Sequence, residues 1–263
     1  MFKAREYKKV RSLEEAYELN QKRNAMVVGG MMWTKMSSYQ KMTVIDLSGL
    51  GLDKIEEDEG EFRIGCMCTL RDLETHPGLD RCFNGIMKEC TRHIVGVQFR
   101  NGATVGGSIY GRFGFSDILT AFLALDSYVE LYHAGIVPLK EFADMPCDND
   151  ILVRVIVKKD GRICDYDSQM RTQTDFPLIA AAVSRLGNQW FVSIGARPAR
   201  ARLVEIQAEE EERRAQGDGI VKKIVSQYRF GTNLRGSAEY RQALAEIYVR
   251  RLMEKIDKEE RRR

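Results

Sequence analysis

The chain has 263 residues, 44% of them hydrophobic and 30% charged, which is typical of a globular protein with a large core. Its 41 basic and 38 acidic residues leave a net charge of only +3, so neither nucleic acid nor an anionic membrane is expected as a main partner. Residues 1–6 contain no apolar signal-peptide core, and no apolar run approaches the ~18–20 residues that span a bilayer, so we expect a cytoplasmic protein.

Hydrophobic periodicity predicts alternating short helices and strands in the first half of the chain. Ser12 and Glu15 form a capping-box pattern, which predicts a helix from Ser12 to Arg23. Thr69 is expected to cap a second helix, which ends before the breaker sequence at 76–78. The other expected elements are strands at 25–28, 43–47, 63–67 and 100–105, a charged hairpin at 53–62, and helices at 80–90 and 117–125.

The second half is predicted to be richer in strands. Strands are expected at 128–132, 151–158, 163–166, 176–186 and 189–194, and helices at 199–208 and from residues 220 and 237 onward. Asp160-Gly161 is a hairpin-turn signal, and near it we place a boundary between a domain at 1–162 and a domain at 163–263. Glu209–Arg214 is expected to be a solvated surface, and Lys255–Arg263 a frayed charged tail.

The six cysteines are irregularly spaced, which favours reduced, buried thiols. The alternative is an iron–sulfur site built from Cys66, Cys68, Cys82 and Cys90. These four do not form C-x-x-C pairs, and Cys66 and Cys68 are expected to share one face of a strand. We therefore predict no metal site.

Two diglycine pairs are the most informative feature of the sequence. Gly29-Gly30 ends an apolar run, and Gly106-Gly107 follows the β-prone run at 100–105, shortly before the acid Asp117. Because glycine has no Cβ, successive N–H groups in such turns can approach a ligand and form a positive nest that suits a diphosphate. Asp117 could accept a hydrogen bond from a ribose. The alternative is that both pairs are ordinary hairpin turns.

Further motifs accompany the diglycines in a fixed order along the chain. They are V-I-D-L at 44–47, I-G-C-M-C-T-L at 64–70, the stretch 98–126, L-R-G-S-A-E-Y-R at 234–241 and V-R-R at 249–251. In these motifs and their order the chain resembles the FAD-binding (medium) subunit of the molybdenum hydroxylases, the family of xanthine dehydrogenase and carbon monoxide dehydrogenase. The matches span nearly the whole chain, which is short for the family.

The resemblance implies an α+β fold. The first domain would be a two-lobed FAD-binding domain of the PCMH/vanillyl-alcohol-oxidase-like type, and a smaller α+β C-terminal domain would follow. It also implies FAD as cofactor, and a 2Fe-2S subunit and a molybdopterin-containing subunit as partners in a hetero-oligomer. Electrons would pass from the 2Fe-2S clusters to FAD and then to NAD or another acceptor. The substrate of such a complex would be a purine or a related heterocycle, and this chain alone would not be a complete enzyme.

The resemblance also assigns cofactor-binding residues. The first loop, assigned to the pyrophosphate and adenosine side, comprises Met26, Val27, Val28, Gly29, Gly30, Met31, Met32 and Trp33. The second loop, assigned to the other side of the diphosphate, comprises Thr104, Val105, Gly106, Gly107 and Ser108. Asp117 matches an acid that contacts a sugar hydroxyl, Leu152 an apolar residue near the flavin ring or the adenine, and Ile94 the position of an aromatic over the isoalloxazine in some relatives. Tyr110 and Phe113 are the aromatic residues best placed to flank a flavin.

The chain departs from the family pattern in its side chains. Met31-Met32 replaces a Thr-Asp pair, and Ser108 replaces an asparagine. Backbone contacts to a cofactor would survive these changes, but side-chain contacts would not. Two alternatives therefore stay open, a flavin-free scaffold subunit and an accessory flavoprotein that feeds a separate reductase.

Overall fold

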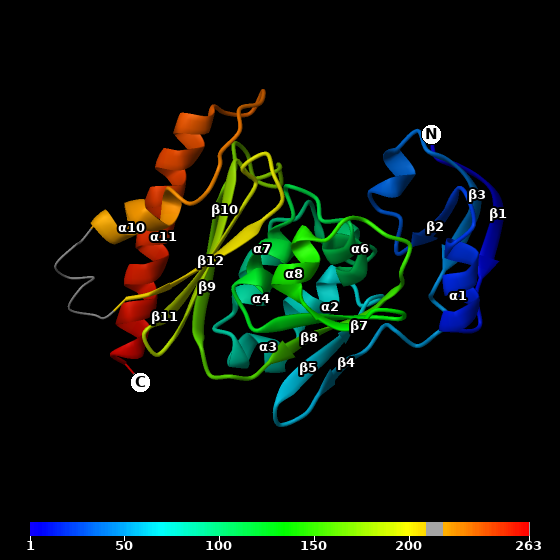
Figure 1. Ribbon diagram of the computed structural model, residues 1–263, viewed down its shortest axis with the longest axis horizontal. Helices are drawn as coiled ribbons and strands as arrows, with labels where there is room; N and C mark the ends of the chain where they lie inside the picture. The colour runs from blue at the N-terminus through cyan, green and yellow to red at the C-terminus, as the bar shows by residue number, and fades with distance from the viewer. Residues whose placement is uncertain (209–217, 263) are drawn as a thin grey trace.

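The computed structural model describes residues 1–208 and 218–262, and the predicted charged surface at Glu209–Arg214 lies outside them. Three β-sheets form the framework of the described chain (Figure 1). A three-stranded sheet belongs to the N-terminal lobe, a five-stranded sheet lies in the middle, and a four-stranded sheet follows toward the C-terminus. Helices separate the second and third sheets (Figure 1).

The N-terminal lobe is a small parallel sheet with one covering helix. Its elements are β1 (Lys3–Lys9), α1 (Leu13–Asn20), β2 (Ala25–Val28), the 3-10 helix η1 (Thr34–Met36) and β3 (Gln40–Asp46), with strand order β1-β3-β2. Helix α1 begins at Ser12, whose hydroxyl accepts the N–H of Glu15 as predicted. The Glu15 carboxylate accepts the N–H of Arg11 instead of that of Ser12. Tyr17 stacks on His133, with ring centroids 5.4 Å apart, and thereby attaches the lobe to the middle of the molecule.

The middle sheet is antiparallel and has the order β4-β5-β8-β6-β7. Its strands are β4 (Ile55–Glu57), β5 (Glu61–Gly65), β6 (Ser127–Leu131), β7 (Gly135–Pro138) and β8 (Leu152–Lys158). The helices of this part are α2 (Leu70–Thr75), α3 (Pro77–Cys82), α4 (Ile86–Thr91), α5 (Val97–Arg100), α6 (Val105–Tyr110), α7 (Asp117–Leu123) and α8 (Leu139–Asp144). Alternating strand residues such as Phe62, Ile64 and Val155 are fully buried in the same core as these helices.

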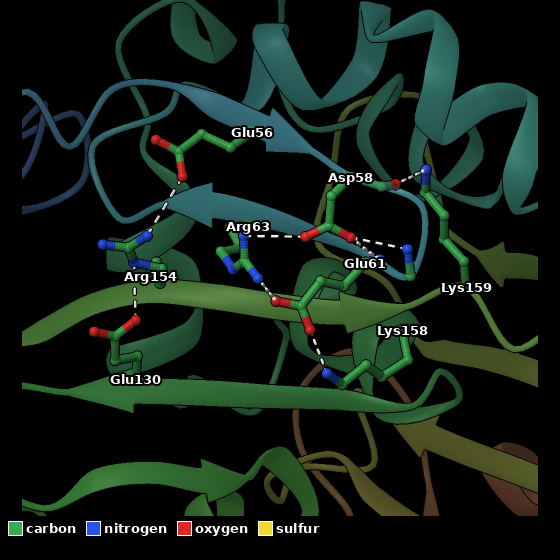
Figure 2. Close-up of polar contacts among 9 residues, drawn as sticks. Glu56, Asp58, Glu61, Arg63, Glu130, Arg154, Lys158 and Lys159 are labelled. Carbon is green, nitrogen blue, oxygen red and sulfur yellow. Dashed lines mark hydrogen bonds and ion pairs between the residues drawn. The ribbon is translucent and has the colours of Figure 1, made fainter.

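Charged side chains gather on these strands away from that core (Figure 2). Arg154 on β8 lies between Glu56 on β4 and Glu130 on β6, at 3.5 and 2.9 Å. Arg63 on β5 pairs with Asp58 at 3.1 Å and also with Glu61. Because cross-strand ion pairs suit a solvated surface, these charges mark the face of the sheet that the helices do not cover.

The C-terminal part is an antiparallel meander backed by two helices. Its elements are β9 (Ile163–Gln169), β10 (Ile179–Leu186), β11 (Gln189–Gly195), β12 (Arg202–Gln207), α10 (Asp218–Val225) and α11 (Ala238–Glu260). Helices α10 and α11 cover one face of this sheet, and α4 and α7 contact the other (Figure 1). Most of its apolar residues form a second core, but Cys164 and Ala180 join the first core. The division between residues 162 and 163 therefore stays a prediction.

Several sequence predictions about elements were wrong. Asp160-Gly161 is not a hairpin turn, because β8 pairs with β5 and β6 while β9 pairs with β10 in another sheet. Residues 100–105 are not a strand, because α5 occupies 97–100 and α6 begins at Val105. Residues 202–207 form strand β12 instead of a helix, because β11 offers an open edge along this segment. The helix expected at 80–90 is split into α3 and α4 by Asn84 and Gly85, which both have positive φ. The tail expected to fray from residue 255 continues helix α11 to Glu260.

The cysteines are unpaired thiols in the structure. Cys66, Cys68, Cys90 and Cys164 are buried, and Cys147 is exposed. Strand β5 ends at Gly65, so Cys66 and Cys68 lie in the turn after it and not in the expected strand. Burial raises the pKa of the Cys66 and Cys68 thiols to about 12, which keeps both protonated at neutral pH. Among residues 1–208 and 218–262, no helix is both long enough and apolar enough to cross a membrane.

Candidate functional site

A cavity of about 390 Å³ lies where the N-terminal lobe, the helical layer and the C-terminal part meet. Its walls come from segments at 29–34, 93–95, 103–108, 113–117 and 174–177, together with Leu70 and Phe99. The predicted site residues that line it are Gly29, Gly30, Met31, Met32, Trp33, Ile94, Thr104, Gly107, Ser108 and Asp117. Segments more than sixty residues apart in the sequence therefore meet at one site, as the two-loop prediction requires.

Six predicted site residues do not line this cavity. Met26, Val27 and Val28 form β2, Val105 and Gly106 are buried in the first turn of α6, and Leu152 lies on β8. The Leu152 side chain is 5% exposed and belongs to the first core. These residues support the walls from behind, and their predicted contacts with a cofactor stay predictions.

The first diglycine is required by a close approach between two loops. A Cβ at Gly30 would overlap the carbonyl oxygen of Gly102, and a Cβ at Gly29 would overlap the side chain of Thr104. Strand β2 therefore ends here, and the loop turns across the segment that leads into α6. These glycines bring the two halves of the cavity wall into contact, a role that the sequence pattern did not reveal.

The loop after β2 carries a series of unused backbone donors. Within residues 1–208 and 218–262, none of the N–H groups from Gly29 to Thr34 donates a hydrogen bond, and all of these residues line the cavity. Met31 has a φ of 55°, in the left-handed region that side chains other than glycine rarely adopt. A left-handed residue within a run of free N–H groups is the geometry of an anion-binding nest. That conformation costs about 1–2 kcal/mol, so the surrounding structure must hold Met31 in it.

The second diglycine has a different structure from the predicted turn. Thr104 caps α6 by accepting the N–H of Gly107, while the N–H groups of Val105 and Gly106 donate to the carbonyl groups of Cys68 and Cys66. These donors are therefore used within the chain and do not form a free nest. A Cβ at Gly106 would lie 2.8 Å from the Cβ of Cys66, so this glycine allows α6 to pack on the turn after β5. Gly107 faces the cavity.

A buried ion pair anchors the segment between the two halves of the wall. Arg100 at the end of α5 donates to both carboxylate oxygens of Glu74 on α2, at 2.8 and 3.1 Å. Both side chains are less than one tenth exposed. Glu74 also pairs with Arg71, at 2.9 Å, whereas removal of Glu74 would leave the Arg100 charge buried without a carboxylate. The pair therefore fixes the residues that lead to Gly102 and Thr104.

Aromatic side chains form one wall of the cavity. Trp33, Phe115 and Phe176 contact one another, with ring centroids 4.4 to 5.4 Å apart, and Phe113 stacks on Phe115 at 5.3 Å. The Arg235 guanidinium lies 5.0 Å from the Phe176 ring on its other side. Phe113 lines the cavity as expected, whereas the Tyr110 hydroxyl donates to Asp148 elsewhere. Sequence reasoning missed Phe176, because no local motif connects it with Trp33.

Asp117 begins helix α7 at the inner end of the cavity. Its side chain is buried and accepts a short hydrogen bond from the Tyr166 hydroxyl of β9. Burial raises the pKa of the Asp117 carboxyl to about 7, although this hydrogen bond opposes the shift. The carboxyl is therefore present in both protonation states near neutral pH.

Comparison with known proteins establishes the family. Residues 2–159 match the family described as the FAD binding domain in molybdopterin dehydrogenase, which covers more than half of the chain. The chain belongs to this family. FAD is accordingly the cofactor of this member of the FAD-binding family, and the α+β fold expected from the sequence is confirmed.

Relatives of this flavoprotein domain match over nearly its whole length. The uncharacterized protein YgfM of Escherichia coli K12 is 26% identical over 244 residues, which are 90% of this chain and 91% of YgfM. A carbon monoxide dehydrogenase from Hydrogenophaga pseudoflava has a similar chain, with a TM-score of 0.81, 21% identity and coverage of 95% and 96% of the two chains. The quinoline 2-oxidoreductase of Pseudomonas putida 86 gives a TM-score of 0.77 at 19% identity, with coverage of 97% and 95%.

The cavity of this FAD-binding domain suits a flavin dinucleotide. Its volume is within the range of about 300–1,000 Å³ that is usual for ligand sites. The free N–H groups of 29–34 suit a diphosphate, and the aromatic wall suits a flat ring. The replacement of Thr-Asp by Met31-Met32 leaves the backbone donors in place.

Proposed function

We propose that this chain is the electron-transfer flavoprotein subunit of a molybdenum hydroxylase-type complex. The observation that carries the proposal is the run of free N–H groups at Gly29–Thr34, held against Gly102 and Thr104 in the wall of the cavity. Such a run binds a diphosphate without help from side chains. The proposal therefore does not require the Thr-Asp pair that Met31 and Met32 replace.

Each wall of the cavity has a role in this proposal. The N–H groups of residues 29–34 bind the diphosphate, and Thr104 and Ser108 lie across from them. The aromatic wall of Trp33, Phe115 and Phe176 orients the ring system and excludes water. Asp117 accepts a hydrogen bond from a sugar hydroxyl. Bound FAD supplies the redox chemistry, and the chain supplies binding, orientation and control of solvent access.

The partners in this proposal are a 2Fe-2S subunit and a molybdopterin-containing subunit. Electrons enter from the 2Fe-2S clusters and leave to NAD or another acceptor, and the substrate of the complex is a purine or a related heterocycle. Support for an oxidoreductase complex comes from the family, which is named for molybdopterin dehydrogenases, and from the similar chains in carbon monoxide dehydrogenase and quinoline 2-oxidoreductase. Copurification of the tagged chain with proteins that contain iron and molybdenum tests this part.

Titration of the purified chain with FAD tests the site. Wild-type protein is expected to bind one FAD per chain, and Gly30→Ala is expected to abolish binding because the added Cβ overlaps Gly102. Gly60→Ala is the matched control, since Gly60 does not line the cavity and its Cβ would meet only Asp58 Oδ1, at 3.7 Å. A wild-type chain that cannot be loaded with FAD would overturn the proposal.

A flavin-free scaffold is the second candidate, and the Met31-Met32 pair is the observation that favours it. In that case the double substitution Met31→Thr and Met32→Asp should restore FAD binding to a chain that lacks it. Tight binding of FAD by the unmodified chain would exclude the scaffold.

A further inference from the structure

The cavity of about 390 Å³ that borders residues 29–34 and Asp117 is the flavin cavity of the proposed function, and a second cavity lies next to it. The second cavity has a volume of about 240 Å³, and its lining includes His93, Tyr166, Asp167 and Ser168. His93 lines both cavities. Tyr166 and Asp117 also connect them, because Tyr166 lines the second cavity, Asp117 lines the first, and the two side chains are hydrogen-bonded.

Side chains with exchangeable protons connect the two cavities. The Tyr166 hydroxyl donates to Asp117 Oδ1, and within the described residues no other side chain donates to this carboxylate. Tyr166 itself lines the second cavity, and burial raises the pKa of its phenol well above the usual range, which keeps the hydroxyl protonated. Ser168 is half-buried on the second cavity, whereas Asp117 and Tyr166 are 7% and 6% exposed. A proton can therefore pass from the second cavity through Tyr166 to Asp117.

The charges around this line come from several elements. Cys90 on α4 interacts with both Asp117 and Tyr166, and burial keeps its thiol protonated by raising its pKa well above the usual range. Burial also raises the pKa of Asp167, while Arg251 and Lys255 on α11 oppose that shift. Glu89 and Arg92 pair with each other at 3.0 Å at the rim of the second cavity. None of these charged groups pairs with the Asp117 carboxylate, so the pH of the solvent sets the protonation state of Asp117.

We propose that Asp117 and Tyr166 form a proton-transfer route between the flavin cavity and the second cavity. This inference rests on the proposed function, in which a partner protein supplies electrons to the flavin. Two-electron reduction of a flavin at neutral pH consumes two electrons and at least one proton. The electrons come from the redox partner and the proton from solvent at the second cavity. Asp117 releases its proton to the flavin cavity, and Tyr166 transfers its hydroxyl proton to Asp117. The phenol oxygen then takes a proton from solvent at the second cavity, so both side chains return to their starting state.

Single-turnover reduction of the FAD-loaded chain by dithionite tests this route. The rate is measured in H₂O and D₂O at about pH 6 and about pH 8.5, on either side of the Asp117 pKa of about 7. Tyr166→Phe is expected to bind one FAD but to be reduced about tenfold more slowly at the higher pH, with a larger solvent isotope effect. At the lower pH Asp117 is already protonated, so the variant is expected to match the wild type. Tyr228→Phe is the matched control, because Tyr228 is a buried tyrosine of the C-terminal core whose hydroxyl donates to the Val192 carbonyl.

Infrared titration of the cofactor-free chain gives a second readout. The carboxyl band that disappears in Asp117→Asn is expected to titrate near pH 7 in the wild type and at a higher pH in Tyr166→Phe, which lacks the opposing hydrogen bond. Equal reduction rates and isotope effects in wild type and Tyr166→Phe at both pH values, with FAD bound, would overturn the route and leave the proposed function intact. Failure of every variant and of the wild type to bind FAD would overturn both.

Discussion

The buried carboxyl of Asp117 predicts how the stability of the FAD-free chain changes with pH. Its pKa is about 7 in the folded chain and 3.8 for an unperturbed carboxyl. Between these values the folded chain holds a proton at Asp117 that the unfolded chain has released. The contribution of Asp117 to the free energy of unfolding therefore falls as pH rises from about 4 to about 7 and is level above that. A shift of about three pKa units at about 1.4 kcal/mol each gives a change of about 4 kcal/mol. Asp117→Asn cannot titrate, and its amide oxygen can still accept from Tyr166.

Urea unfolding of wild type and Asp117→Asn at a series of pH values measures this difference. All other groups titrate equally in the two chains, so the stability of Asp117→Asn relative to wild type should rise by up to about 4 kcal/mol between pH 4 and pH 8. Two stability curves that stay parallel over this range would show that Asp117 has an ordinary pKa. Water would then reach the Asp117 carboxyl, and Asp117 could not hold the proton that the proposed route transfers at neutral pH.

Three further variants test the packing around the cavity. Gly30→Ala should lower the free energy of unfolding by roughly 1–3 kcal/mol, because the loops at Gly30 and Gly102 must separate. A thermal unfolding curve that matches the wild type would contradict this contact. Trp33→Ala should weaken FAD binding about tenfold through loss of aromatic contact, as measured by calorimetry, and an unchanged dissociation constant would place the flavin elsewhere. Glu74→Ala leaves the buried Arg100 guanidinium without a carboxylate and should cost about 3–5 kcal/mol in urea unfolding. A cost below about 1 kcal/mol would mean that water reaches this guanidinium.

The sequence predicted the first loop of the site better than the second. Val27 and Val28 are β-branched residues before Gly29, and this local pattern correctly gave a strand followed by a turn. Residues 100–105 have a similar β-prone composition, yet they lead into a helix. The reason is a distant partner, since the turn after β5 accepts the N–H groups of Val105 and Gly106. A pattern that considers only neighbours in the sequence cannot include that partner.

Long-range contacts also explain the other differences. Segment 202–207 became a strand because β11 offered it an edge, which the alternation of Val204 and Ile206 alone did not settle. Tyr166 was assigned only to a strand, although it contacts Asp117 from forty-nine residues away. Phe176 meets Trp33 across an even longer separation. The prediction therefore found loop residues that line the cavity, but not which side chains complete its walls.

Three parts of the chain border the cavity, and this has a consequence for the living cell. A ligand that binds only the folded form stabilises it in proportion to the logarithm of the free ligand concentration. Since segments from the N-terminal lobe, the helical layer and the C-terminal part all border this space, an empty chain is expected to open there first and to be digested by proteases. The amount of this protein in a cell should thus rise and fall with the supply of riboflavin, even when its gene is read at a constant rate.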